Sequence, residues 1–344
     1  MPATRRSAVK ATANKSGVQQ ERNNKSTNDT ETVKRVHDIE ALPFVQYTSV
    51  VGVHTTLLLF TALFLPRTAF LSDLTRPSRD PNTMTSLDKP QHPFLDELTL
   101  SPMSTLAWIC VGVVVLQAWW GGWMRRWYVD GIVKGSVEDR KMQRVEWEKQ
   151  GFRNLRDACL ATLGMSVVLH IVLVLFGAPL TNCSTPFATG PECPSDNLIP
   201  RTYLLALLLS LLSVPVPAYT LGIPKRGNDS QTLVNRFTWI RLYAELSLRN
   251  PFERALVYPT IGAFIGSWIG AIPIALDWDR PWQASTPTLS FIQSRAWPLT
   301  PAFGSIAGFT LGSISALTVS SIQYMAHEHL RAQAQSDTTR RKSN

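Results

Sequence analysis

The sequence predicts an all-α integral membrane protein with about six transmembrane helices and both termini in the cytosol. Its apolar residues come in runs of about 20, the length of a helix that crosses a hydrocarbon core of about 30 Å. Lys and Arg are concentrated in alternate connections between these runs. The mean hydropathy is −0.01 only because apolar blocks and polar connections cancel. The strands of a membrane β-barrel would instead alternate over about 10 residues.

Six spans are expected, and they cover residues 45–65, 102–123, 158–178, 198–221, 256–276 and 298–324. The fourth span carries Pro215 and Pro217 near its end, which predicts a kink or an early exit because proline lacks a backbone N–H. The run 138–156 mixes both signs of charge with apolar residues. That composition is typical of an amphipathic helix lying on a membrane surface.

The segments outside this membrane domain, which covers residues 45–325, are polar. Residues 1–44 are basic and rich in Asn, Thr and Ser, which predicts a disordered cytosolic tail. Residues 326–344 form a second cytosolic tail, whose pair Arg341-Lys342 has the offset of a retrieval signal for the endoplasmic reticulum. The net charge of +9 comes from residues beside the spans, so it indicates a cytosolic membrane face rather than a nucleic-acid partner.

The orientation follows from the Lys and Arg residues of each connection. The N-terminal tail holds eight, the segment after the second span nine, the segment after the fourth six, and the C-terminal tail four. The intervening segments hold four, none and two. Because cytosolic segments carry the excess of positive charge, this alternation places both termini in the cytosol.

Two cysteines lie in the connection that has no Lys or Arg, which the charge pattern places in the lumen. Cys183 and Cys193 are ten residues apart in sequence, and an oxidising lumen would allow them to close a loop. The sequence therefore favours a disulfide between them, with two free thiols as the alternative.

The fifth and sixth spans each carry three glycines at every fourth position. They are Gly262, Gly266 and Gly270 in the fifth span, and Gly304, Gly308 and Gly312 in the sixth. Such a ladder leaves one helix face without side chains, so that a neighbouring backbone can approach closely. Two interpretations stay open: the two helices pack on each other, or one face receives a helix from another protein.

The connection between these spans contains a conspicuous polar and aromatic run. It reads Leu276-Asp277-Trp278-Asp279-Arg280-Pro281-Trp282-Gln283, and the connection closes with Trp297-Pro298. One interpretation is a site in which Asp277 and Asp279 hold a divalent cation and Arg280 clamps a phosphate. The other is an interfacial anchor, with the tryptophans at headgroup depth. Residue chemistry favours the anchor, because two carboxylates are too few ligands and no His or Glu lies in this loop.

The remaining sequence offers little that could carry catalysis. His54 and His170 lie inside spans, where a lone neutral histidine is more often an interhelical hydrogen-bond partner. The sequence has no zinc-protease helix, no phosphate-binding glycine loop and no nucleophile elbow. No cofactor is therefore expected.

The stretch from Gly262 to Gly312 resembles the PIG-F family, the small multispanning endoplasmic-reticulum proteins of glycosylphosphatidylinositol-anchor synthesis. The resemblance rests on the glycine ladders, the run from Leu276 to Gln283, and the Trp297-Pro298 pair that opens the next helix. This chain departs from the family by an insertion at 284–296 between the last two elements.

The resemblance implies a non-catalytic subunit in the endoplasmic-reticulum membrane. Its partner would be a large multispanning transferase that moves phosphoethanolamine onto mannoses of the anchor precursor and performs the chemistry itself. Two other functions stay open. One is a membrane-embedded lipid or phosphoethanolamine transferase that uses Asp277, Asp279 and Arg280. The other is a lipid carrier, which ranks last because the sequence shows no clear internal repeat.

Overall fold

A computed structural model of the chain describes residues 43–67, 98, 101–132, 137–178, 199–225, 227, 229–275 and 297–343. All elements within these ranges are helical. Six of the described helices or helix pairs are long and apolar enough to cross a membrane. Most of the tail 1–44, the cysteine pair Cys183 and Cys193, and the motif 277–283 lie outside the described residues.

The chain divides into two compact units, and residues 46–323 form the larger one. The smaller unit joins residues 1–45 and 324–344. Within its described part, the ring of Phe44 stacks on that of Tyr324 with centroids 5.4 Å apart. Residues 324–343 are helical, so the segment expected as a polar tail continues the last helix.

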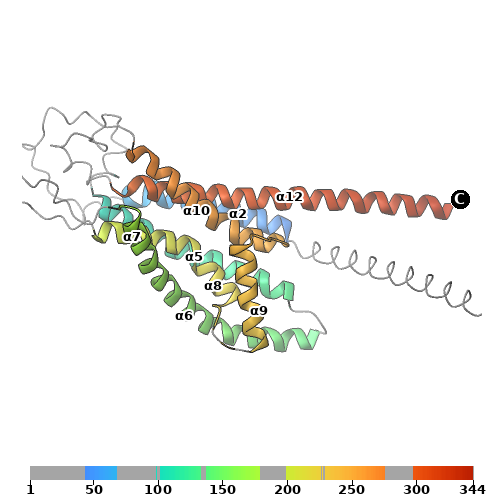
Figure 1. Ribbon diagram of the computed structural model, residues 1–344. Helices are drawn as coiled ribbons and strands as arrows, with labels where there is room; N and C mark the ends of the chain where they lie inside the picture. The colour runs from blue at the N-terminus through green and yellow to red at the C-terminus, as the bar shows by residue number, and fades with distance from the viewer. Residues whose placement is uncertain are drawn as a thin grey trace, which may run out of the picture. The chain divides into compact units, whose positions relative to one another are not determined.

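The spanning elements follow the predicted order, and several extend beyond the apolar runs (Figure 1). They are α2 (Phe44–Phe64), α5 (Pro102–Ile132), α6 (Val137–Leu175), α7 (Ile199–Ser213) with α8 (Pro215–Leu221), α10 (Pro251–Ala275) and α12 (Leu299–Ser343). The fourth span is interrupted at Val214, directly before Pro215, since proline cannot donate to the helix that precedes it.

The expectation of a separate surface helix at 138–156 is wrong. This charged stretch is the first half of α6, a single helix of 39 residues that runs on into the third span. Charged residues with good helix propensity continue a helix as readily as apolar ones once it is nucleated. Hydropathy marks where such a helix enters the membrane and gives no signal of where it begins.

The core of the larger unit lies between α2, α5, α7, α10 and α12. Its most buried members include Leu58, Leu106, Ile109, Val113, Leu205, Leu208, Ala263, Ala302 and Ile306. Hydrogen bonds between helices add to this packing. Ser210 donates to the Thr162 carbonyl at 2.6 Å, and Ser166 and Tyr203 share a hydrogen bond of 3.1 Å. Small polar contacts of this kind are a principal means of holding helices together in lipid.

Arg125 joins three helices at the end of the bundle where α5 ends and α6 begins. Its guanidinium donates to the carbonyls of Tyr219 in α8 and Trp147 in α6, both at 2.8 Å. It also lies over the Tyr219 ring, 4.9 Å from the centroid. A buried guanidinium needs such partners because leaving its donors unsatisfied would cost several kcal/mol, about 1–3 per group.

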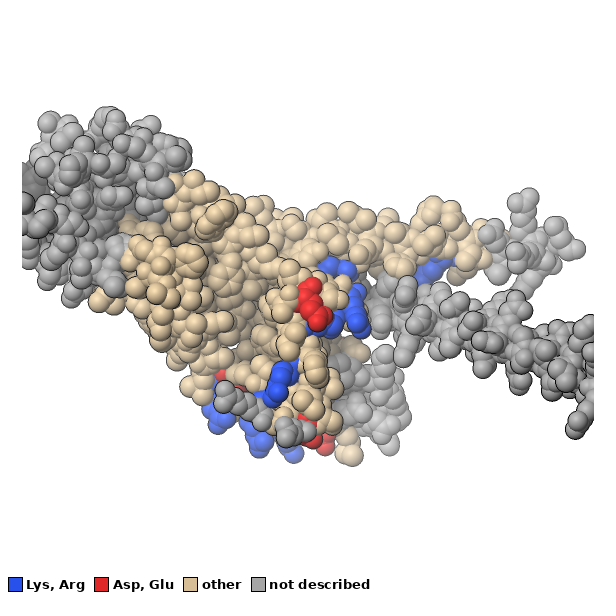
Figure 2. All heavy atoms as spheres, in the orientation of Figure 1, with Lys and Arg blue, Asp and Glu red and all other residues tan. Residues whose placement is uncertain are grey.

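The segment between α8 and α10 is partly helical. It contains α9 (Ser230–Trp239) and the π-helical turn η3 (Ile240–Ala244), flanked by non-helical residues. Figure 1 shows α9 running crosswise to the spans. The Lys, Arg, Asp and Glu side chains visible in Figure 2 gather around α9 and the neighbouring helix ends, and the surface along the spans is almost free of them.

Candidate functional site: the α10–α12 helix pair

The two glycine ladders face each other. Gly262, Gly266 and Gly270 of α10 lie against the backbone of α12, and Gly304, Gly308 and Gly312 of α12 lie against the backbone of α10. The register is antiparallel, with Gly262 beside Gly308 and Gly312, and Gly270 beside Thr300 and Pro301. The structure therefore brings all six predicted packing residues together in one interface inside the chain.

Each of these glycines is required by the close approach of the two backbones. A Cβ atom built at any of the six would lie closer than 3.0 Å to a carbonyl oxygen of the facing helix. At Gly266, Gly308 and Gly312 it would also come closer than 3.0 Å to a facing Cα atom. Backbones in such contact gain dispersion energy that lipid chains cannot match, and they allow weak Cα–H···O contacts.

At one end of the pair, the described part of the sequence motif secures the start of α12. The indole of Trp297 donates to the Thr202 hydroxyl of α7 at 3.2 Å. Pro298 follows in a cis peptide bond, and its carbonyl accepts from the Ala302 N–H at 3.2 Å. Asp277, Asp279 and the rest of the run up to Gln283 lie outside the described residues, so their role stays a prediction.

At the other end, Arg254 of α10 reaches across to α12. Its Nε atom donates to the Ser320 hydroxyl at 3.3 Å, and the residue is buried. Phe252, two residues earlier, packs against the rings of Trp127 and Tyr128 on α5, with centroids 5.5 and 5.1 Å away. The first turn of α10 is thus held by α12 and by α5 together.

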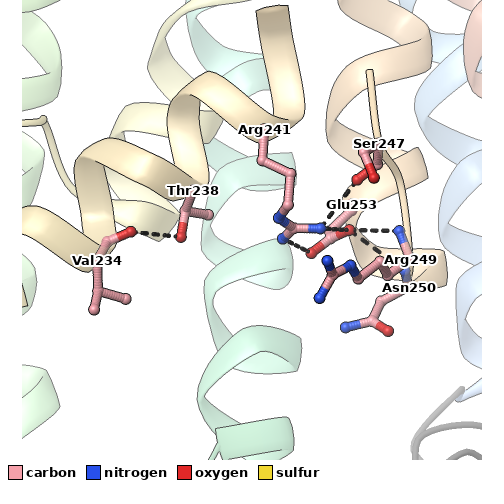
Figure 3. A network of polar contacts seen from close by, with 7 residues as sticks. All are labelled: Val234, Thr238, Arg241, Ser247, Arg249, Asn250 and Glu253. Atoms are coloured by element: carbon pink, nitrogen blue, oxygen red, sulfur yellow. Dashed lines mark hydrogen bonds and ion pairs between the residues drawn. The ribbon is translucent and has the colours of Figure 1, made fainter. Parts of the chain in front are cut away.

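Glu253 occupies the same turn and pairs with Arg241 of η3 (Figure 3). Both guanidinium Nη atoms donate to its carboxylate, one to each oxygen, and Nη1 also donates to the Ser247 carbonyl at 3.0 Å. The hydrogen bond to Glu253 raises the pKa of Arg241 above its ordinary value. The two side chains are 22% and 11% exposed, so water screens this bidentate pair less than a surface ion pair.

Glu253 also caps α10. Its carboxylate accepts from the backbone N–H groups of Arg249 and Asn250, at 2.7 and 3.4 Å. The sequence Asn250-Pro251-Phe252-Glu253 is a capping signature, with Asn before the helix, Pro in its first position and Glu in its third. The charge pattern along the chain registers Arg241 and Arg254 only as positive charges, whereas this capping signature is the feature of the sequence that marks Glu253.

His54 of α2 is surrounded by aromatic side chains in the core. The ring of His54 is fully buried and stacks on Trp120 of α5 at 4.8 Å, with Phe309 of α12 at 5.8 Å. His170 packs edge-on against Tyr203 at 5.8 Å. Among the described residues, no group of three or more His, Cys, Asp or Glu side chains could hold a metal ion.

Substituting Gly308 by Ala should destabilise the protein, although alanine is the better helix former by about 1 kcal/mol. The added methyl group would push against the Gly262 carbonyl and part the two backbones, at a cost of about 1–3 kcal/mol. Gly164 of α6 offers a matched control, because a Cβ there meets nothing within 4 Å. Thermal unfolding in detergent should show a lower midpoint for Gly308→Ala and no decrease for Gly164→Ala. Equal midpoints for the two variants would contradict the backbone contact.

Removing the Glu253 carboxylate should destabilise the charged end of α10. Glu253→Ala leaves Arg241 and two backbone donors without their acceptor, which should cost about 2–4 kcal/mol. Glu253→Gln keeps the shape and one acceptor oxygen and should cost less. The double variant with Arg241→Glu and Glu253→Arg restores an ion pair of reversed polarity and should recover part of the lost stability. Midpoints that fall equally in Glu253→Ala and Glu253→Gln would show that the charge, and not the cap, dominates.

Comparison with known proteins places this helix pair within a described family. The sequence profile of the GPI biosynthesis protein family Pig-F matches residues 91–317, which include both glycine ladders. No solved structure matches the chain.

Three curated relatives illustrate the similarity. The "GPI ethanolamine phosphate transferase, stabilizing subunit" of Mus musculus is 30% identical over 156 residues, covering 45% of this chain and 54% of the relative. The protein of the same name from Homo sapiens is 29% identical over 156 residues, with the same coverage. The "Glycosylphosphatidylinositol anchor biosynthesis protein 11" of Pyricularia oryzae is 32% identical over 160 residues, covering 46% of this chain and 45% of the relative.

The chain spans about half the length of the curated relatives it matches. The family match itself is longer and runs through α5, α6, α7, α8, α9 and α10 into α12. Because residues 91–317 make up more than half of the sequence, the chain belongs to the GPI biosynthesis protein family Pig-F.

Proposed function

We propose that this chain is a non-catalytic stabilising subunit of a transferase that adds phosphoethanolamine to mannoses of the GPI-anchor precursor in the endoplasmic reticulum. The observation that carries the proposal is the tightly closed α10–α12 pair inside the family-matched region. Two relatives of this chain are named as stabilizing subunits of GPI ethanolamine phosphate transferase.

The geometry indicates how such a subunit would meet its partner. Because the two glycine ladders pack against each other, a partner helix that meets this pair would contact its outer faces. The outer face of α10 exposes large apolar side chains, and these are Phe264, Ile265, Trp268, Ile269 and Ile272. A rigid pair presents this face at a fixed orientation, which lowers the entropic cost of association.

The proposal includes the topology. The end of α5, the start of α6, Lys225 after α8, the helix α9 and the start of α10 carry charged residues, and these gather at one end of the larger unit (Figure 2). This arrangement supports the alternation of Lys and Arg along the chain, which assigns that end to the cytosol. The loop 276–296 would then face the lumen, where the partner's substrate lies.

Loss of this chain should lower the amount of the transferase in the membrane. Cells that lack the chain, rescued with the wild type or with Gly164→Leu, should restore transferase abundance and GPI-anchored surface proteins. Rescue with Gly308→Leu should fail, because the bulky side chain separates α10 from α12. Immunoblotting of the transferase and purification of the tagged chain in mild detergent, followed by mass spectrometry, measure the outcome.

Catalysis by the chain alone would overturn the subunit proposal. If the purified chain transferred phosphoethanolamine and Asp279→Asn abolished that activity, the loop from Asp277 to Arg280 would be an active site instead. On the subunit proposal the purified chain is inactive. Asp277→Asn then leaves both the recovery of the transferase and its activity close to those of the wild type.

The topology has its own test in intact microsomes, whose outer surface is cytosolic. In a chain with its native cysteines replaced, Lys149→Cys in the charged half of α6 should react with a membrane-impermeant maleimide. Thr189→Cys, in the connection after the third span, should react only after the membrane is permeabilised. The reverse pattern would invert the proposed orientation without affecting the fold.

A further inference from the structure

The helix α9 presents an apolar stripe to its surroundings in the most highly charged part of the larger unit. Four residues of α9 and η3 share one helix face by their spacing and are exposed; they are Leu233, Val234, Phe237 and Ile240. Val234 and Phe237 are each 65% exposed. Contiguous apolar surface on a polar part of a protein marks a contact with another molecule or with a membrane.

The opposite side of α9 is fixed to the end of the fourth span. The Asn235 amide and the Trp239 indole both donate to the Gly222 carbonyl, at 3.3 and 3.0 Å. Arg236 donates to the Lys225 carbonyl at 3.0 Å. Gly222 has a φ of 78°, a conformation that glycine adopts without strain, and this lets the chain turn sharply from α8 towards α9. The exposed stripe therefore cannot rotate inward without breaking these bonds.

Connectivity determines what lies against the stripe. The chain leaves a span at Leu221 and enters the next at Pro251, so both ends of the segment that contains α9 are tied to the same membrane boundary. The helix runs crosswise to the spans (Figure 1), which is the direction of a membrane surface. An amphipathic helix in this position places its apolar face between headgroups and acyl chains.

We propose that α9 is an interfacial helix. The apolar stripe of α9 lies in the bilayer surface at the charged end of the bundle. The depth of α9 in the bilayer then fixes the position of the first turn of α10. The link is the contact in Figure 3, where Arg241 follows the stripe directly and holds Glu253 in the first turn of α10. Leu246, in the connection between Arg241 and Glu253, adopts a φ of 51°, which is unusual for a residue with a side chain. This restricts the backbone conformations that the connection between η3 and α10 can adopt.

The first part of the proposal is tested by the depth of α9 in a bilayer. The full chain, with its native cysteines replaced, is spin-labelled at Val234 or Phe237 and reconstituted in phosphatidylcholine vesicles. Collisions with oxygen should exceed those with a water-soluble nickel chelate by several-fold at both positions. A label at Glu148, which is exposed in the charged half of α6, is the control and should show the reverse.

Two outcomes would overturn the interfacial assignment. If the labels at Val234 and Phe237 collided with the nickel chelate as readily as the label at Glu148, α9 would lie in water. Few collisions with either reagent would mean that protein, such as a second copy of the chain, covers the stripe. Neither result bears on whether the chain stabilises a transferase, because the measurement needs no partner.

The coupling to α10 is tested by hydrogen exchange of the full chain in the same vesicles. Phe237→Asp should lift α9 from the surface and speed amide exchange several-fold in the first turn of α10, around Glu253 and Arg254. Phe237→Leu keeps an apolar side chain and should leave exchange unchanged. Exchange in the core of α5, at Val113, should stay slow in both variants and shows that the bundle is intact. Unchanged exchange at Glu253 in Phe237→Asp would overturn the coupling.

Discussion

The backbone contact between α10 and α12 is the constraint on which the rest of the larger unit depends. Lipid chains are as apolar as the side chains of a span, so the hydrophobic effect supplies little force to hold helices together. Six glycines remove the side chains from both facing surfaces and let the two backbones touch over the length of the pair. The two ladders meet in an antiparallel register, with Gly262 beside Gly308 and Gly312. That register brings Trp297 to the first turn of α7 and Arg254 to Ser320 at the opposite end.

The charged end of the bundle uses a different kind of contact, since water is near and guanidinium groups can be tolerated there. Arg125 joins α5, α6 and α8 through two backbone carbonyls, and Arg241 joins η3 to α10 through Glu253. Each arginine is partly withdrawn from water, so each needs a full set of acceptors. Because those acceptors belong to different helices, satisfying the arginines also fixes the relative positions of the helix ends.

The sequence predicted six long apolar helices because each contains a long apolar run, and it predicted a distortion near Pro215 because proline lacks a donor. The helical extension of α6 before its span carries no such signal. The glycine spacing predicted a close approach and left open which helix would approach. The Arg241–Glu253 pair was beyond prediction for a similar reason: the capping signature reveals Glu253, but pairing across a turn depends on the path of the chain through α9 and η3.

A subunit that stabilises another membrane protein must offer a surface that does not itself rearrange. The glycine faces cannot be that surface here, because they are filled by each other. Their contribution would be indirect: by closing α10 on α12 they hold the outer face with Trp268 at one angle. The connection through Glu253 extends this rigidity towards the membrane surface. On the proposed subunit role, a side chain added at Gly308 would therefore weaken the partner without touching it, whereas one added on the outer face of α10 would act at the proposed contact itself.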